Sequence, residues 1–122
     1  PTNDFNRGTN FGSGYFDVNQ KRGRRWSAAT AFLKPVLNRP NLTLATRVTV
    51  ERVILEDGRA TGVEYTLDGE RRLAKAAREI VLSAGAVASP ALLERSGLGD
   101  GARLQGLGVE TRRHLPGVGE PR

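Results

Sequence analysis

The stretch that decides the fold is residues 79–93, which read Glu-Ile-Val-Leu-Ser-Ala-Gly-Ala-Val-Ala-Ser-Pro-Ala-Leu-Leu. Its first half is a short apolar run that closes in small residues, as in a buried strand followed by a tight turn. Ser89-Pro90 then predicts a helix start, with Ser89 as N-cap and Pro90 at the first helical position. Ser96-Gly97 predicts the end of this helix. Strand, turn and helix form half of a nucleotide-binding unit, so the predicted fold class is α/β (α+β mixed).

The residues before this stretch predict a three-stranded β-meander of roughly 30 residues, in which each strand has a length that is usual in globular proteins. Strand-like sequence begins at 42–46, and the alternation in 48–55 slips near Arg52, which indicates a bulge or a strand covered on both faces. Residues 63–67 alternate as a half-buried strand does, and a weaker third strand follows through Leu73. Two Asp-Gly pairs mark the hairpin turns, and they occupy positions 57–58 and 68–69.

The first part of the chain predicts less regular structure. Residues 1–14 are rich in Asn, Gly and Ser and predict a loop. Residues 15–20 have strand composition and end at a turn signal, Lys21-Arg22-Gly23. Ser27 is a suitable N-cap for a helix that runs through Leu33. Pro35 and then Asn38-Arg39-Pro40 end it, because proline lacks an N–H donor and clashes with the preceding turn.

Composition limits the class of protein. The 122 residues suffice for one domain, and the absence of Cys excludes disulfides, thiolate metal sites and a Cys nucleophile. No run is long enough to span a membrane and no signal segment is evident, so we predict a cytoplasmic protein without a transmembrane segment. The net charge is +6. The basic residues are dispersed apart from the cluster at 21–25, which favours a solvated surface over nucleic-acid binding.

Several motifs have simpler explanations than a catalytic or ligand-binding role. Residues 97–102 fit G-x-G-x-x-A, but they follow a helix rather than a strand, so we interpret them as a glycine loop. His114 is the sole histidine and has no acidic or nucleophilic neighbour in sequence. Asn41-Leu42-Thr43 matches a glycosylation acceptor only by pattern. No serine has a Ser–His–Asp arrangement, and no group has metal-ligand spacing. The residues alone therefore indicate part of an α/β nucleotide-binding protein.

Longer motifs resemble a known family, the glucose–methanol–choline oxidoreductases. Residues 85–99, a small-residue turn followed by Ser-Pro, two aliphatics and Ser-Gly-Leu-Gly, resemble the second signature of that family. Four shorter stretches agree with it in the same order, and they occupy 23–29, 39–43, 59–65 and 115–120. The resemblance covers nearly the whole chain. It is greatest with the choline dehydrogenase-like and alcohol dehydrogenase-like branches.

This resemblance implies part of an FAD/NAD(P)-binding Rossmann-like domain, with FAD as cofactor and a small alcohol as substrate. Family members oxidise the alcohol by hydride transfer to the flavin and use a C-terminal His. The chain lacks both that region and the N-terminal G-x-G-x-x-G. We therefore expect an internal piece without catalytic residues or metal, inactive alone and prone to association through unpaired strand edges. The implied division is a segment adjoining the substrate-binding domain at 1–40 and a partial FAD-binding domain at 41–122.

The resemblance also implies cofactor-binding positions. Val50 matches a valine whose backbone contacts the FAD adenine, although it could be an ordinary core valine. Ala84 and Gly85 match small residues beside the flavin, and the alternative there is a tight strand-to-helix turn. Two other classes stay open: a small non-catalytic nucleotide-binding or interaction module, and a basic nucleic-acid-interacting protein.

Overall fold

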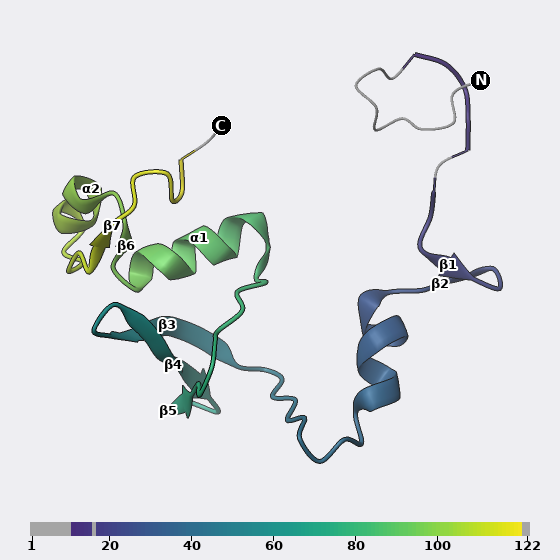
Figure 1. The fold of residues 1–122 in the computed structure, drawn as a ribbon, viewed down its shortest axis with the longest axis horizontal. Helices are drawn as coiled ribbons and strands as arrows, with labels where there is room; N and C mark the ends of the chain where they lie inside the picture. The colour runs from purple at the N-terminus through teal and green to yellow at the C-terminus, as the bar shows by residue number, and fades with distance from the viewer. Residues whose placement is uncertain (1–10, 16, 121–122) are drawn as a thin grey trace. The chain divides into compact units, whose positions relative to one another are not determined.

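The computed structural model describes residues 11–15 and 17–120. The chain divides into two compact units, Pro1–Leu44 and Ala45–Arg122 (Figure 1). This division lies four residues beyond the predicted boundary after residue 40. The assignment of the two parts to a substrate-binding and an FAD-binding domain stays a prediction.

The first unit contains a small hairpin and a short helix. Strands β1 (Gln20–Lys21) and β2 (Arg24–Arg25) pair antiparallel. Arg22 and Gly23 both have positive φ, 53° and 72°, as a tight hairpin turn requires. The turn is thus confirmed, but the strand predicted over 15–20 is wrong for the described residues before Gln20. Among these residues only Asn19 is bonded to another described segment, through its carbonyl, which accepts the Trp26 N–H at 2.9 Å. Phe16 and residues 1–10 lie outside the described residues.

The predicted helix after Ser27 is present in an irregular form. It consists of a π-helical turn, η1 (Ala29–Leu33), followed by a 3₁₀ turn, η2 (Lys34–Val36). The Ser27 hydroxyl accepts a hydrogen bond from the Thr30 N–H at 3.3 Å, as an N-cap does. Pro35 cannot donate to a regular helix, and the Lys34 N–H instead reaches the Ala29 carbonyl, five residues back.

The second unit is built on the predicted meander. Strands β3 (Thr49–Glu56), β4 (Arg59–Leu67) and β5 (Glu70–Lys75) form an antiparallel sheet in the order β3-β4-β5. Both Asp-Gly turns are confirmed, because all four of their residues have positive φ. Residues 42–46 form no strand, so that prediction is wrong. A sheet order of this kind leaves one edge of β3 without a neighbouring strand.

The predicted slip in β3 is a β-bulge. Val50 pairs with Tyr65 and Arg52 with Glu64, so Glu51 is the extra residue on β3. A second irregularity lies on β4, where Thr61 is extra between Ala60 and Gly62. Bulges bend a strand and increase its twist, and here they leave backbone groups of Val50 and Glu51 available to side chains.

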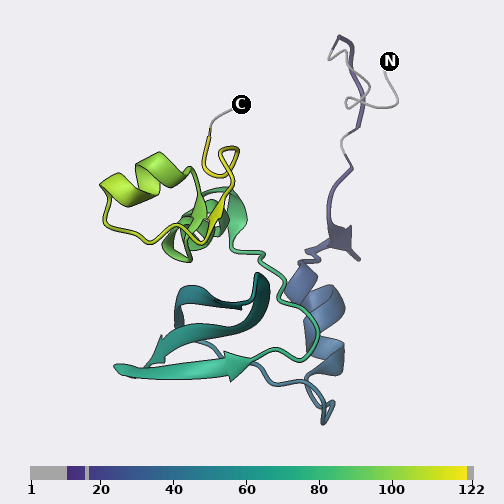
Figure 2. The ribbon, with the colours of Figure 1, turned by 60° about the vertical axis from the view of Figure 1, so that its left-hand side comes forward.

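The stretch 79–93 differs from its prediction in two ways. Residues 79–83 form no strand and run as a loop from β5 to α1 (Figure 2), and Val81 is 76% exposed. A strand needs a segment that shares its hydrogen bonds, and no backbone hydrogen bond joins 79–83 to another described segment. Helix α1 (Gly85–Arg95) begins four residues before Ser89, and Pro90 lies inside it. The predicted end at Ser96-Gly97 is confirmed: Ser96 is the C-cap and Gly97 has a φ of 84°.

The remaining elements pack against the end of α1. Strand β6 (Leu98–Gly99) pairs parallel with β7 (Arg113–His114), and helix α2 (Gly101–Gly106) lies between them in sequence. Asp100 caps α2 by accepting the Arg103 N–H at 2.8 Å. The interpretation of 97–102 as a loop is therefore wrong.

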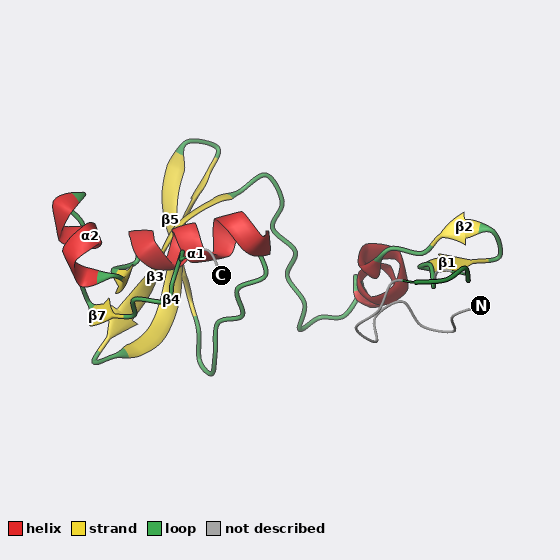
Figure 3. Ribbon diagram, turned by 90° about the horizontal axis from the view of Figure 1, so that it is seen from above, coloured by secondary structure: helices red, strands yellow, loops and turns green. Residues whose placement is uncertain are grey.

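The core of this unit is small. Val53 of β3, Leu92 of α1 and Leu104 of α2 are its buried apolar residues among those described, and Ser96 is buried with them. Figure 3 shows α1 lying over the meander beside β3. The mixed helix-and-strand class and the three-stranded meander are confirmed.

Candidate functional site

The first candidate site is the turn that opens α1. Ala84, the N-cap residue, is exposed, and its N–H donates to the Ser89 hydroxyl at 3.0 Å. Ser89 therefore stabilises the turn from inside the helix instead of starting the helix itself. Gly85 has a φ of 91°, a conformation that side chains disfavour, and a Cβ added to it would meet no atom within 4 Å. Glycine is required here by the backbone, and the space beside it is open.

The electrostatics of this turn favour an electron-rich ligand. The first N–H groups of a helix lack partners within it, and its N-terminus carries partial positive charge. No acidic residue occupies the first turn of α1. Residues 84–88 are exposed, and Val87 is 84% exposed. The turn can therefore donate backbone hydrogen bonds to a phosphate or a ring carbonyl.

The second candidate position is the bulge of β3. Val50 is half-buried, and the fully buried valine of this strand is Val53. The Arg95 guanidinium donates through Nε to the Glu51 carbonyl at 3.2 Å and, more loosely, through Nη2 to the Val50 carbonyl at 3.5 Å. Because the bulge turns two successive carbonyls to the same side, one guanidinium reaches both.

The structure does not bring the predicted residues into one site. Gly85 and Arg95 are at opposite ends of α1, and their separation along the helix axis is about 15 Å at 1.5 Å per residue. Val50 lies near the Arg95 end and Ala84 at the other. Such an arrangement suits only a ligand with two separated groups. The roles of Val50, Ala84 and Gly85 stay predictions.

Sequence reasoning missed Ser96 and Arg95 as contacts. The Ser96 Oγ accepts the Val53 N–H at 2.8 Å and donates to the Leu92 carbonyl at 2.7 Å. It joins the end of α1 to the open edge of β3. The sequence near Ser96 indicates only a helix end, through its Ser-Gly pair. It does not indicate a hydrogen-bond partner that lies 43 residues away in sequence.

Other candidates have structural explanations. The Nδ1 of His114 accepts the Gly101 N–H at 3.0 Å, which ties β7 to the start of α2. Gly97 allows the close approach of another segment, since an added Cβ would lie 2.5 Å from the Glu110 carbonyl oxygen. Among the described residues no group of His, Asp or Glu is placed to hold a metal ion. The helices of this part of the chain are too short or too polar to cross a bilayer.

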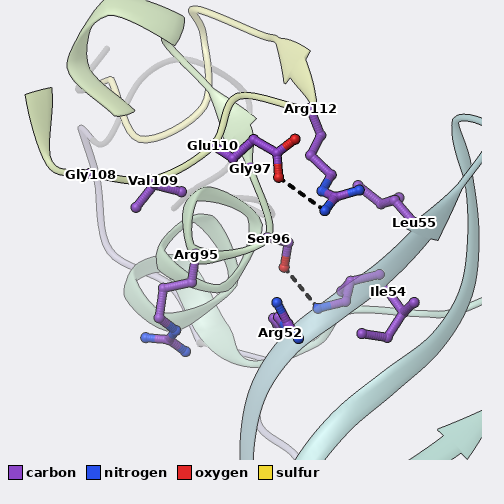
Figure 4. A pocket seen from close by; sticks show the side chains of 11 residues that line it. Arg52, Ile54, Leu55, Arg95, Ser96, Gly97, Gly108, Val109, Glu110 and Arg112 are labelled. Carbon is purple, nitrogen blue, oxygen red and sulfur yellow. Dashed lines mark hydrogen bonds and ion pairs between the residues drawn. The ribbon is translucent and has the colours of Figure 1, made fainter. Parts of the chain in front are cut away.

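A cavity of about 370 Å³ lies where β3, the end of α1 and residues 108–112 meet (Figure 4). Ser96 and Val53, which are joined by a hydrogen bond of 2.8 Å, line it. Arg112 and Glu110, which pair at 3.1 Å, also line it. Of the predicted site residues, neither Val50 nor Ala84 nor Gly85 lines it. This cavity is therefore distinct from the predicted cofactor positions.

Comparison with known proteins defines the class. The family model described as GMC oxidoreductase matches residues 1–120. A family model that covers nearly the whole chain, together with the mixed fold, shows that this chain belongs to the GMC oxidoreductases. Members of this family are flavoproteins that bind FAD.

Individual relatives agree with this assignment. The chain is 46% identical to the mitochondrial choline dehydrogenase of Mus musculus over 119 residues, covering 98% of this chain and 20% of that protein. It is 47% identical to the oxygen-dependent choline dehydrogenase of Rhizobium rhizogenes, covering 97% of this chain and 21% of the relative. It thus spans about one fifth of the length of these relatives.

A solved structure gives the same result. The chain superimposes on pyridoxine 4-oxidase from Mesorbium loti with a TM-score of 0.74 and 40% identity, over 80% of this chain and 19% of that one. An FAD-dependent oxidoreductase from Chaetomium thermophilum matches with a TM-score of 0.64 and 30% identity, over 68% of this chain and 15% of that one.

Proposed function

We propose that this chain contributes part of the FAD-binding fold to an oxidoreductase that acts on the CH–OH group of an alcohol, with choline-like alcohols as the substrate class. The observation that carries the proposal is the exposed turn at Ala84–Gly85, which opens a helix without acidic residues and leaves open space beside its glycine. The names of the choline dehydrogenase relatives support the substrate class.

The residues of this turn fit the proposed cofactor. FAD, when bound, supplies the hydride acceptor. Ala84 and Gly85 would contact its flavin part through backbone atoms, because their small size permits close approach. Val50, toward the other end of α1, would contact the adenine part through its backbone. Arg95 would hold the bulge that presents Val50.

Catalytic residues are not assigned to this chain. We expect the purified chain alone to show no alcohol-dependent dye reduction above a flavin-only blank, since the Nδ1 of its sole histidine, His114, accepts the Gly101 N–H. A cytoplasmic location stays a prediction from the sequence. The name of the mouse relative places that protein in mitochondria.

Flavin retention tests the proposal. In the purified chain, a visible absorption spectrum would measure bound FAD. Ala84→Val adds volume at the proposed contact, and the φ of Ala84, −83°, lies outside the left-handed region that favours glycine. We expect this variant to lose most of its bound FAD. Ala102→Val, the same change at an exposed position of α2, is the control and should retain it.

The melting midpoint of each sample separates binding from folding. If Ala84→Val melts like the control and still holds FAD at full occupancy, this turn is not the flavin site. If the purified wild-type chain binds no FAD, the proposal that this chain binds FAD by itself is wrong. The alternative of a small interaction module would then be favoured.

A further inference from the structure

The open edge of β3 faces a groove. The cavity of about 370 Å³ described above adjoins a second one of about 570 Å³, and they share Leu55, Glu110 and Arg112 as lining residues. The second cavity continues past Leu55 to the turn at Asp57-Gly58. Together they run along the unpaired edge of β3, with residues 108–113 as the opposite wall. All of these residues belong to the second unit.

Only the first half of this edge is satisfied within the chain. The Glu51 carbonyl accepts from Arg95, and the Val53 N–H donates to Ser96. Backbone groups of alternate residues point to the same side of a strand, so those of Leu55 face the groove as the N–H of Val53 does. In the described part of the chain, no residue outside the sheet forms a hydrogen bond with Leu55. An edge of this kind is a template for a further strand.

The walls of the groove are cationic. Arg52, Arg95, Arg112 and Arg113 line it. Arg112 is paired with Glu110, and Arg52 with Glu64 at 2.8 Å. Within residues 11–15 and 17–120, no carboxylate lies within ion-pair distance of Arg95 or Arg113.

The floor supplies apolar contact. Ile54, Leu55 and Val109 line the groove between the charged walls, and Leu98 lies beside the second cavity. Among the described residues that line it, Asp57 is the one acidic residue without a cationic partner, and it lies at the far end, in the turn. An occupant therefore meets backbone groups, a few aliphatic side chains and positive charge that the chain itself does not neutralise.

We propose that this groove binds a short extended peptide of a partner protein, which adds to the free edge of β3 as a strand and carries carboxylates toward Arg95 and Arg113. Main-chain hydrogen bonds to Leu55 supply the part of the affinity that does not depend on the peptide sequence, and contacts with the peptide side chains supply specificity. The charge favours acidic peptides over neutral ones. The groove shares Arg95 with the bulge proposed to present Val50 to FAD, but Val50, Ala84 and Gly85 do not line it.

A labelled peptide tests both parts of the proposal. The probe is a fluorescent hexapeptide of alternating Val and Glu, and its anisotropy is followed as the purified chain is added. We expect saturable binding that is lost when Gln replaces Glu. We also expect loss when alternate backbone nitrogens of the probe are methylated, because this change keeps the charge and blocks the strand edge. Equal binding of the methylated probe would show a merely electrostatic attraction and overturn the proposal.

Variants locate the binding. Arg113→Gln should weaken binding of the acidic probe about two- to fivefold, the usual effect of one exposed charge pair. Arg78→Gln removes an exposed charge outside the groove and should leave binding unchanged. If both variants weaken binding equally, the groove is not the site. If the chain self-associates and the acidic probe fails to compete, a second copy occupies the edge and the proposal is wrong.

Discussion

At the scale of single residues, a buried serine joins two elements of the second unit. Ser96 bridges helix and sheet by accepting one backbone hydrogen bond and donating another. A buried polar group is costly when it loses its partner, so the contribution of such a residue is seen when it is removed.

Ser96→Ala should therefore lower the free energy of unfolding by about 1–3 kcal/mol, because the Val53 N–H is left buried without an acceptor. Urea unfolding measures the change. Ser83→Ala, at an exposed serine whose side chain forms no hydrogen bond with the described residues, should shift it little. Equal effects of the two substitutions would mean that the Ser96 bridge contributes nothing.

Gly85 is a poorer position than Ala84 for a substitution that tests cofactor binding. Its φ of 91° strains any side chain whether or not a ligand is bound. We expect Gly85→Ala to destabilise the chain by about 1–2 kcal/mol, and Gly85→Val to do so at least as much. Gly106→Ala, in a helix with open space around it, should instead be neutral or stabilising. A Gly85→Ala chain as stable as Gly106→Ala would contradict the observed backbone.

At the scale of elements, the meander depends on close approach between strands. Gly62 of β4 is buried, and a Cβ added there would lie 2.7 Å from the Ala74 carbonyl oxygen of β5. Ion pairs add to the pairing, since Glu64 of β4 contacts Arg52 of β3 at 2.8 Å and Arg71 of β5 at 3.7 Å. These exposed pairs contribute little compared with the backbone spacing.

Gly62→Ala should separate β4 from β5 locally and cost about 1–3 kcal/mol, the range for overpacking. We expect this variant to show faster amide exchange in β5 than in β3, measured by hydrogen exchange with mass spectrometry. Gly106→Ala again provides the same substitution without the clash. Unchanged exchange in β5 would show that the strands adjust without loss of pairing.

At the scale of the whole molecule, little apolar surface is buried. The described core consists of Val53, Leu92 and Leu104, while large apolar side chains such as Phe32 and Val87 are more than three-quarters exposed, at 76% and 84%. Exposed apolar surface and an open strand edge both favour association.

We therefore expect the isolated chain to be marginally stable or to associate. Sedimentation and a thermal melt at several concentrations would measure this. A monomeric, cooperative melt above about 60 °C, near the top of the usual mesophilic range, would contradict it.

What the sequence determined by itself is local. Both Asp-Gly turns, the turn at 21–23 and the end of α1 were predicted correctly, because each depends on the backbone preference of a few neighbouring residues. The slip near Arg52 was also visible in the pattern, and the structure shows that it is a bulge rather than a strand covered on both faces. The family was also evident, since its motifs are continuous in the chain.

What only the tertiary structure decided is long-range. Residues 79–83 have the composition of a strand, yet a strand exists only where another segment shares its hydrogen bonds. Ser89 has the composition of an N-cap, yet its hydroxyl stabilises a turn five residues back. The contacts of Ser96 and Arg95 with β3 join residues more than 40 positions apart, and no local pattern encodes such a partner. Their position, and with it the groove along β3, follows from packing α1 against the open edge of the sheet.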